Sequence, residues 1–187
     1  MRTFAPATIT LLVAIGSFAQ DVRKVTWGQD INTVRQIEGK TPLQQNENTL
    51  SCKDKVAGYD CYLQYVFSHS GLVAAGYGFD IKHTNKNDFI DDFKKIKKVL
   101  TTKYGEPSSD DQIWKDDLYK DDEQEWGMAI SVGHLNFRSA WENDRTLIVL
   151  ALDGDNFEIH LNAVYYSCHV AHYLDSISLK KWDRTFS

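Results

Sequence analysis

Hydrophobic residues recur at helical spacing in two segments of the chain. The first contains Ile31, Val34 and Ile37, which lie three residues apart and follow Asp30. Aspartate is a favourable N-cap, because its side chain accepts hydrogen bonds from the first N–H groups of a helix. Gly39 then supplies the left-handed conformation in which helices often end. The pattern predicts a helix of about two to three turns.

The second helical segment is longer and more clearly amphipathic. It begins at Asn87 or Asp88, both favourable N-caps, and ends at Gly105 before Pro107. Its apolar residues form one stripe, and the lysines fall mostly off that stripe. The stripe contains Phe89, Phe93, Ile96 and Leu100. Such a helix is expected to bury one face against another element.

Elsewhere the hydrophobic pattern alternates, which is typical of half-buried strands. Three such runs lie between Thr49 and Ile81, and three more lie between Leu135 and Tyr166, the last of them starting at Phe157. Consecutive strands joined by short polar turns pair in an antiparallel sheet. The expected turns are Ala57–Gly58, Ser68–Gly71, Asn143–Asp144 and Asp153–Asn156. Three other segments are expected to be a short strand (Gln20–Gly28), a loop (Lys40–Asn48) and either a short helix or an extended run (Glu123–Val132).

These elements predict an α+β fold: an antiparallel sheet of two three-stranded meanders with two amphipathic helices packed on one face. The helix-plus-meander unit occurs twice, at 20–84 and 85–166. Residues 20–187 are therefore expected to form a single α+β domain, with the alternative that it consists of two such halves. Residues 167–187 are weakly patterned and are expected to form an irregular C-terminal tail.

Residues 1–19 have the three parts of a secretory signal peptide. Arg2 gives a positive start, 7–18 is apolar and uncharged, and small residues precede a cleavage site before Gln20. The apolar run is shorter than the about 20 residues that a membrane-spanning helix needs. A lipoprotein needs a cysteine directly after the cleavage site, and the first cysteine is Cys52. The sequence therefore predicts a soluble exported protein, periplasmic or extracellular, without a membrane span or lipid anchor.

The composition indicates a packed globule and excludes one class of partner. Hydrophobic residues make up 42% of the chain and charged residues 25%, which is typical of a globular protein. The formal net charge is −5, and removal of Arg2 with the signal peptide makes it −6. An acidic chain repels a phosphate backbone, so nucleic acid is not an expected partner.

Three cysteines in an oxidising compartment suggest one disulfide and one remaining thiol. Cys52 and Cys61 flank the turn expected at Ala57–Gly58, and two strands that fold back there would bring them close together. We therefore expect a Cys52–Cys61 disulfide, with Cys168 either free or paired with another chain.

Several short motifs resemble those of small exported bacterial proteins of unknown function. The start Val22–Gly28, followed by Val34, resembles an "F-R-x-V-x-W-G-x-S-x-x-x-V" opening, although Gln29–Asp30 stands where that pattern prefers Met-Ser. Leu100–Pro107 resembles an "L-x-x-K-Y-G-x-P" helix exit. Further matching positions are Leu63–Phe67, Gly71–Val73, Gly76–Tyr77, Trp114, Trp141 and Thr146–Ile148.

The helix-then-meander arrangement is also similar to β-lactamase-inhibitor-protein-like modules and to small outer-membrane assembly lipoproteins. This resemblance implies the helix-then-meander fold and a protein-binding function without catalytic residues. The chain departs from the lipoproteins because it lacks their cysteine, so the assembly role itself does not carry over.

Few residues form a pattern typical of catalysis or of metal binding. No Gly-x-Ser-x-Gly motif and no glycine-rich phosphate loop occurs, and Ser68–His69–Ser70 is expected to be a polar hairpin tip. We therefore predict no catalytic residues, no cofactor and no assigned metal site. The remaining candidate ligands for zinc or copper are Cys168, His169 and His172, of which the first and last would share a face of one helical turn.

Residues 108–125 form the most acidic segment, and apolar and aromatic residues are embedded in it. The pattern favours a half-exposed Trp114, in contrast to Trp27, Trp126 and Trp141, which lie in or beside predicted elements. We expect an interaction surface here, formed by Trp114, Asp116, Asp117 and Tyr119. Loose calcium binding by the carboxylates of this segment is an alternative.

Taken together, these features predict an exported, non-catalytic module that binds another protein or a component of the cell envelope. The alternative is an exported protein that binds a small ligand or a metal, and a third hypothesis is a hydrolase without a recognisable motif. The sequence leaves the identity of the partner open.

Overall fold

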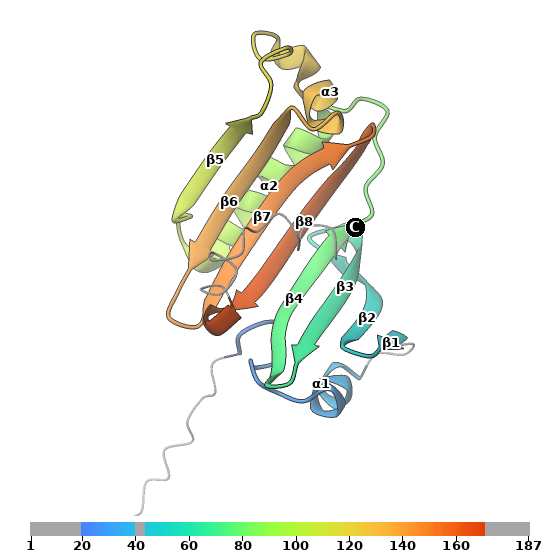
Figure 1. Cartoon of the computed structure of the whole chain (residues 1–187), viewed down its shortest axis with the longest axis vertical. Helices are drawn as coiled ribbons and strands as arrows, with labels where there is room; N and C mark the ends of the chain where they lie inside the picture. The colour runs from blue at the N-terminus through green and yellow to red at the C-terminus, as the bar shows by residue number, and fades with distance from the viewer. Residues whose placement is uncertain (1–19, 40–43, 171–187) are drawn as a thin grey trace, which may run out of the picture.

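The computed structural model describes residues 20–39 and 44–170 of the 187-residue chain (Figure 1). The expected signal peptide at 1–19 lies outside the described residues. So does most of the expected tail at 167–187, of which Ser167 ends the last strand and 168–170 form a helical turn. The elements, in order, are α1 (Ile31–Glu38), β1 (Gln44–Asn46), β2 (Thr49–Val56), β3 (Tyr59–Ser68), β4 (Gly71–Phe79), α2 (Asp88–Tyr104), β5 (Ser109–Trp114), the 3₁₀-helix η1 (Glu123–Glu125), α3 (Trp126–Ser131), β6 (Leu135–Glu142), β7 (Thr146–Asp155) and β8 (Glu158–Ser167).

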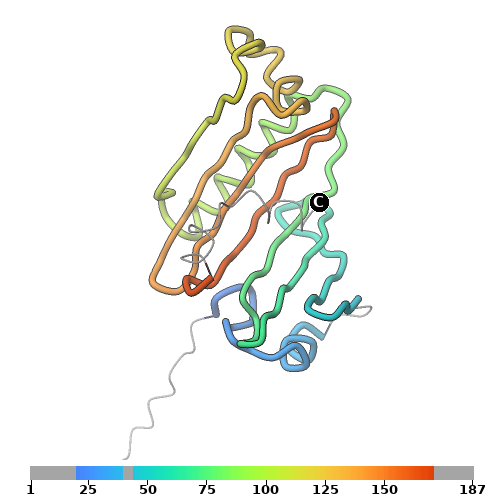
Figure 2. The backbone as a smooth tube through the Cα atoms, in the orientation of Figure 1, coloured from blue at the N-terminus to red at the C-terminus, as the bar shows by residue number. Residues whose placement is uncertain are grey.

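Eight strands form one antiparallel sheet in the order β1-β2-β3-β4-β8-β7-β6-β5. The first four strands make one half and the last four make the other, as the path of the chain in Figure 2 shows. The halves join where β4 pairs with β8, from Ala74–Tyr166 to Gly78–Asn162. The α+β class and the antiparallel sheet are confirmed, but the two three-stranded meanders are a correction: each half has four strands.

The two strands that the sequence pattern missed, β1 and β5, form the edges of the sheet. All three residues of β1 are exposed, and every residue of β5 is exposed except the half-buried Trp114. A strand without a buried face carries no alternating hydrophobic signal, so its pattern is that of a polar loop. The strand expected at Gln20–Gly28 is wrong, because this segment turns back on itself through a single bridge between Val22 and Val25.

Helices α1 and α2 pack on the same face of the sheet, as the pattern predicts, since Val34 of α1 and Phe93 of α2 belong to one continuous core. The Asp30 side chain accepts hydrogen bonds from the N–H groups of Asn32 and Thr33, and Gly39 ends α1 with φ of 58°. Residues 123–131, whose conformation the sequence left open, form η1 and α3. Two helices are therefore too few, because α3 also covers this face through Ala129 and Ile130.

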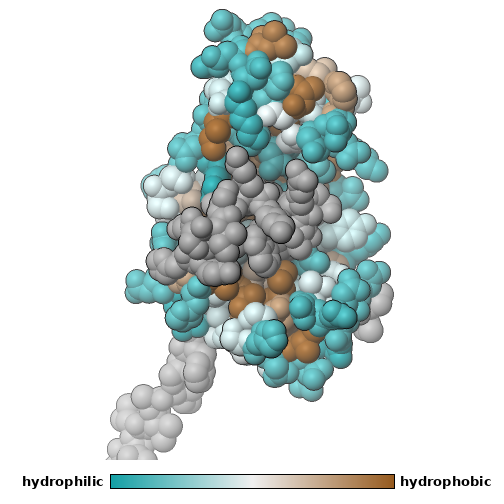
Figure 3. Space-filling view, viewed as in Figure 1, coloured by the Kyte–Doolittle hydropathy of each residue, from teal (hydrophilic) through white to brown (hydrophobic). Residues whose placement is uncertain are grey.

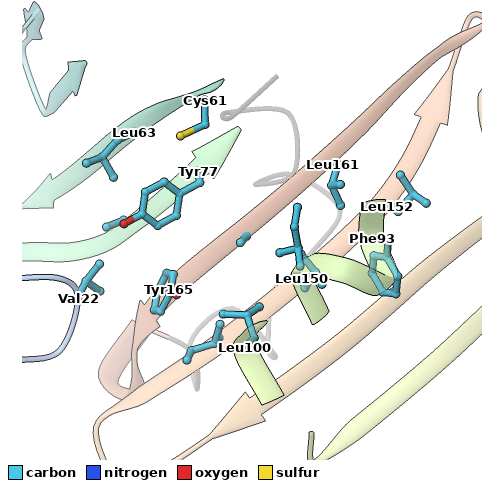
Figure 4. Packing of buried hydrophobic residues seen from close by; sticks show 14 of the residues in the cluster. Val22, Cys61, Leu63, Tyr77, Phe93, Leu100, Leu150, Leu152, Leu161 and Tyr165 are labelled. Atoms are coloured by element: carbon cyan, nitrogen blue, oxygen red, sulfur yellow. The ribbon is translucent and has the colours of Figure 1, made fainter. Parts of the chain in front are cut away.

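The core lies between this face and the helices. Leu150 and Leu152 of β7 and Leu161 of β8 lie beside Phe93 and Leu100 of α2 (Figure 4). Full burial of a leucine side chain stabilises a fold by about 2 kcal/mol, so this layer holds α2 on the sheet. A smaller apolar cluster on the opposite face contains Val66, Ala74, Val149, Val164 and Tyr166.

A partly buried charged network ties α1 to the first half of the sheet. Nε of Arg23 lies 3.3 Å from Oε1 of Glu38, and the same guanidinium pairs with Asp54. The Tyr65 hydroxyl donates to Oε1 of Glu38 over 2.5 Å, and the Glu38 side chain is only 2% exposed. Burial, together with this hydrogen bond, raises the pKa of Tyr65 above its ordinary value. Arg23 adopts a left-handed φ of 55°, which places its side chain at the centre of the network.

The β7–β8 hairpin turns two residues later than the sequence predicts. β7 continues to Asp155, which pairs with Glu158, so the turn consists of Asn156 and Phe157 and not of Asp153–Asn156. The sequence pattern predicts the turn too early because Gly154 follows an aspartate, and a glycine after an aspartate is a strong turn signal. The turns expected at Ala57–Gly58 and Asn143–Asp144 fall between strands as predicted, and the one expected at Ser68–Gly71 is centred between β3 and β4, which end and begin at those two residues.

Among the described helices, none combines the length and the hydrophobicity needed to cross a membrane.

Candidate interaction site

One end of the sheet combines acidic side chains with exposed apolar ones. The segment 115–125, which leads from β5 into α3, contains six acidic residues and two lysines. The β7–β8 turn lies against α3, since the Phe157 N–H donates to the carbonyl of Ser131 over 2.9 Å. We call residues 114–131 together with the turn 155–158 the acidic end.

Aromatic rings form the base of the acidic end. Trp114 meets Trp126 edge-on with 6.0 Å between ring centroids, and Trp126 lies 6.4 Å from Phe137. The ring of Tyr119 lies 5.7 Å from that of His134. Trp114, Tyr119 and Trp126 are half-buried, so they anchor the segment to the sheet and still reach the surface.

Asn87 fastens the acidic end to the start of α2. Its side-chain N–H groups donate to the carbonyls of Glu123 and Gln124, each over 3.0 Å, and its oxygen accepts from the Gly127 N–H over 2.6 Å. Asn87 is therefore at the N-cap position that the sequence predicts, but its side chain makes no capping hydrogen bond to α2. It fixes η1 and α3 instead.

Two glycines allow this close packing. A Cβ on Gly127 would lie 2.3 Å from the backbone carbon of Lys86 and 2.5 Å from the Asn87 nitrogen. A Cβ on Gly154 would lie 2.7 Å from the carbonyl oxygen of Ile130. Contacts this short to backbone atoms cannot be relieved by a side-chain rotation. The residues just before α2 and the β7–β8 hairpin therefore hold α3 tightly from two sides.

The acidic end carries the most exposed large hydrophobic side chains of the described residues. These are Leu118, which is 71% exposed, and Phe157, which is 65% exposed. Figure 3 shows hydrophobic side chains among hydrophilic ones over the end of the molecule that carries α3. Exposed apolar groups rimmed by polar residues are typical of surfaces that bind other proteins.

Most of the acidic charge faces solvent. Asp116 accepts a hydrogen bond from the Leu118 N–H over 2.9 Å, and Asp117 pairs with Lys120 at 2.9 Å. The Asp116 and Asp117 side chains remain 55% and 74% exposed. Nδ1 of His134 is buried without a hydrogen-bond partner among the described residues, 3.7 Å from Oδ1 of Asp116. Because Asp116 and Asp117 are exposed, their carboxylates are accessible to a positively charged partner.

The residues that the sequence predicts for an interaction surface, Trp114, Asp116, Asp117 and Tyr119, lie together in the acidic end. The sequence pattern gives no indication that Leu118 is exposed, and it predicts Phe157 in a strand. Local pattern gives no signal that the hairpin of β7 and β8 ends beside the acidic segment, because that neighbourhood depends on the order of the strands in the sheet.

The structure does not join Cys52 and Cys61 by a disulfide, which corrects the sequence-based expectation. Both side chains are buried on the same face, but Cys52 lies opposite Leu63 and Cys61 lies opposite Asp54. The two cysteines are therefore diagonal neighbours, whose Cα atoms lie about 7 Å apart in an antiparallel pair. A disulfide usually needs a Cα separation below about 6.8 Å.

Of the candidate metal ligands, His172 lies outside the described residues. Cys168 is half-buried and His169 is exposed, both in the helical turn after β8. Burial, together with nearby carboxylates, raises the pKa of the Cys168 thiol and so lowers its thiolate fraction at neutral pH. Within 20–39 and 44–170, no three His, Cys, Asp or Glu side chains are placed to hold a metal ion together.

The most buried aspartate of the described core is Asp92 on α2, which is 3% exposed. It accepts hydrogen bonds from the Tyr59 hydroxyl at 2.7 Å and from the Lys95 ammonium at 3.0 Å, and it lies 2.5 Å from Nε2 of His83. Burial alone raises the pKa of Asp92, but the hydrogen bonds from His83, Tyr59 and Lys95 outweigh burial and lower it below 3.8. The group ties α2 to Tyr59 at the start of β3.

Asp92→Asn is expected to lower the free energy of unfolding by about 2 kcal/mol at neutral pH, because hydrogen bonds to a charged group are lost. Since the folded-state pKa lies below 3.8, the stabilisation is complete well above pH 3.8 and declines as the pH falls through the folded-state pKa. Urea unfolding at about pH 7 and about pH 3 measures the difference. Asp91→Asn, at an exposed neighbour, is the control, and a pH-independent difference would contradict the assignment.

A hollow of about 100 Å³ lies where the start of the described chain meets the β6–β7 turn. Its lining includes Asp21 and Arg145, whose guanidinium donates two hydrogen bonds of 2.7 Å to the Asp21 carboxylate. Small-molecule sites usually enclose about 300 Å³ or more, and the charged groups of this hollow already bind each other. The acidic end therefore remains the stronger candidate site.

Comparisons with protein families, with curated proteins and with solved structures find no match to this chain.

Proposed function

We propose that this protein is an exported, non-catalytic module that binds another protein through the acidic end. The observation that carries the proposal is the exposure of Leu118 and Phe157 on a frame that Asn87 and Gly127 hold close to α2. A surface fixed before binding loses little conformational entropy when the partner docks, which favours affinity.

The sequence of residues 1–19 supports export, because it has the charge, the apolar run and the small-residue site of a signal peptide. The resemblance to β-lactamase-inhibitor-protein-like modules supports protein binding without catalysis. The cell envelope or the extracellular medium is therefore the proposed place of action.

The buried carboxylates also support a non-catalytic role. Asp21 binds Arg145, Glu38 binds Arg23 and Tyr65, and Asp92 binds His83 and Tyr59. Each of them is occupied by a partner from a distant part of the chain. Contacts of this kind, between parts of the chain far apart in sequence, are typical of carboxylates that stabilise a fold.

Leu118→Ser is expected to weaken partner binding about tenfold, since a central apolar contact commonly contributes more than 1 kcal/mol. The binding partner is first enriched from the exported proteins of the producing cell on the immobilised full chain, and then purified. Its affinity for the wild type and for the variant is compared by titration calorimetry.

Val99→Ser is the matched control, because Val99 is also a large exposed hydrophobic residue, 50% exposed, but lies on α2 outside the acidic end. The proposal requires that this control bind the partner as the wild type does. Equal loss in both variants, or no loss in either, would show that the acidic end is not the binding surface.

A further inference from the structure

The turn between β7 and β8 has a conformation that its sequence does not favour. Asn156 has φ of 47° and Phe157 has φ of 69°, in a two-residue turn between Asp155 and Glu158. Such turns strongly prefer Asn-Gly, because both positions need positive φ and only glycine adopts it without a steric cost. Asparagine tolerates this region, whereas a bulky aromatic residue there is an outlier. Phe157 therefore stands at a glycine position.

The backbone of Phe157 is held on both sides, while its side chain is not. Its N–H donates to the carbonyl of Ser131 over 2.9 Å, and its carbonyl accepts from Nζ of Lys86 over 2.8 Å. The side chain is 65% exposed, and it contributes to neither of the two hydrophobic clusters of the described residues. Strain of this kind is retained when the surrounding structure imposes it, and it concentrates at functional sites.

The charges beside Phe157 indicate the chemistry of what would cover it. Asp155 and Glu158 flank the turn in sequence and are exposed, and neither forms an ion pair with another of the described residues. The ammonium of Lys86 is also at this turn, but it is bound to the Phe157 carbonyl. The neighbouring segment 115–125 adds further carboxylates. An exposed aromatic residue with unpaired carboxylates on both sides in sequence is complementary to an apolar pocket with a basic rim.

We infer that Phe157 is the anchor of the interface: its ring enters an apolar pocket of the partner protein, and lysine or arginine residues around that pocket meet Asp155 and Glu158. This inference rests on the proposed function and names one residue and one partner chemistry within it. A second copy of this chain is a poor occupant, because its own acidic end and net charge of −5 would repel it.

Two variants of the full chain separate strain from contact. Phe157→Gly removes both the ring and the strain, so its Tm is expected to rise by about 2 °C. Phe157→Ala removes the ring but keeps a side chain at positive φ, so its Tm is expected not to rise. Both variants are expected to bind the purified partner at least about tenfold more weakly. A Tm that falls in Phe157→Gly would assign the ring a role in stabilising the fold and would overturn the inference.

The chemistry of the partner is tested with a photo-crosslinking p-benzoylphenylalanine at position 157 and, as a control, at the position of Tyr62, which is 49% exposed on β3. The expected result is a crosslink from position 157, and not from position 62, to an apolar residue that lies beside lysines or arginines in the partner. Asp155→Asn combined with Glu158→Gln is expected to weaken the salt dependence of binding. A crosslink to a second copy, or an unchanged salt dependence, would refute the basic partner.

The outcomes also distinguish the two proposals. If Leu118→Ser weakens binding and Phe157→Ala does not, the acidic end is the binding surface but Phe157 is not its anchor. If neither weakens binding, both proposals fail.

Discussion

Substitution of Gly127 by alanine is expected to lower the free energy of unfolding by about 3 kcal/mol, because over-packing against a rigid neighbour costs about 1–3 kcal/mol or more. The added Cβ would lie 2.3 Å from the carbonyl carbon of Lys86. The residues just before α2 must therefore move away from α3. That movement also breaks the 2.6 Å hydrogen bond from the Gly127 N–H to Asn87. Urea unfolding measures the loss of stability, and a shift in the fluorescence of the adjacent Trp126 reports the displacement of α3.

Gln124→Ala is the control for Gly127→Ala. Gln124 is exposed in η1, and only its backbone carbonyl contacts Asn87, so the substitution is expected to change stability by less than about 0.5 kcal/mol. If Gly127→Ala were as stable as this control, the close packing of α3 against the segment before α2 would be wrong. Because α3 lies beneath the acidic end, the destabilised variant is also expected to bind the partner more weakly.

Glu38→Ala is the second substitution with a large expected effect, again about 3 kcal/mol, because it removes a charged acceptor that two partly buried groups share. Arg23 would lose one of its two carboxylate partners, and the buried hydroxyl of Tyr65 would lose its acceptor. The change is measured by urea unfolding at neutral pH.

Two further variants calibrate this result. Tyr65→Phe removes only the hydroxyl and is expected to cost about 1.5 kcal/mol, as for a hydrogen bond to a charged group. Gln36→Ala lies on the same helix at an exposed position and is expected to be nearly neutral. A cost for Glu38→Ala below that for Tyr65→Phe would mean that Arg23 does not depend on Glu38.

The elements with a buried stripe were predictable from the sequence. The spacing of Phe89, Phe93, Ile96 and Leu100 defines the buried face of α2, and Asp30 and Gly39 bound α1, because a periodic apolar face and a cap are local signals. The turn at Ala57–Gly58 was also local. A two-residue turn at this place also fixes the register, in which Cys52 and Cys61 are diagonal and not opposite, so the expected disulfide was already inconsistent with the expected turn.

The candidate site was predictable only in part. Trp114 and Tyr119 were identifiable as aromatic residues within an acidic segment. The contributions of Asn87, Gly127 and Phe157 depend on which strands and helices become neighbours across the sheet, and this is a property of the tertiary structure. At Phe157 the residue type also conflicts with the backbone conformation. An aromatic residue favours a strand, so the sequence pattern predicts a strand where the chain turns.

Strand β5 leaves one row of backbone N–H and C=O groups without a neighbouring strand, and so does β1 at the other edge of the described sheet. Open edges invite polymerisation, in which copies add to one another strand by strand into fibres. β1 is only three residues long, and β5 carries adjacent carboxylates at Asp110 and Asp111. Asp110 is paired with Lys97, so the exposed Asp111 carboxylates are the charges that repel each other when two β5 strands approach. The acidity of this part of the chain therefore also protects a concentrated solution of the protein from fibre growth.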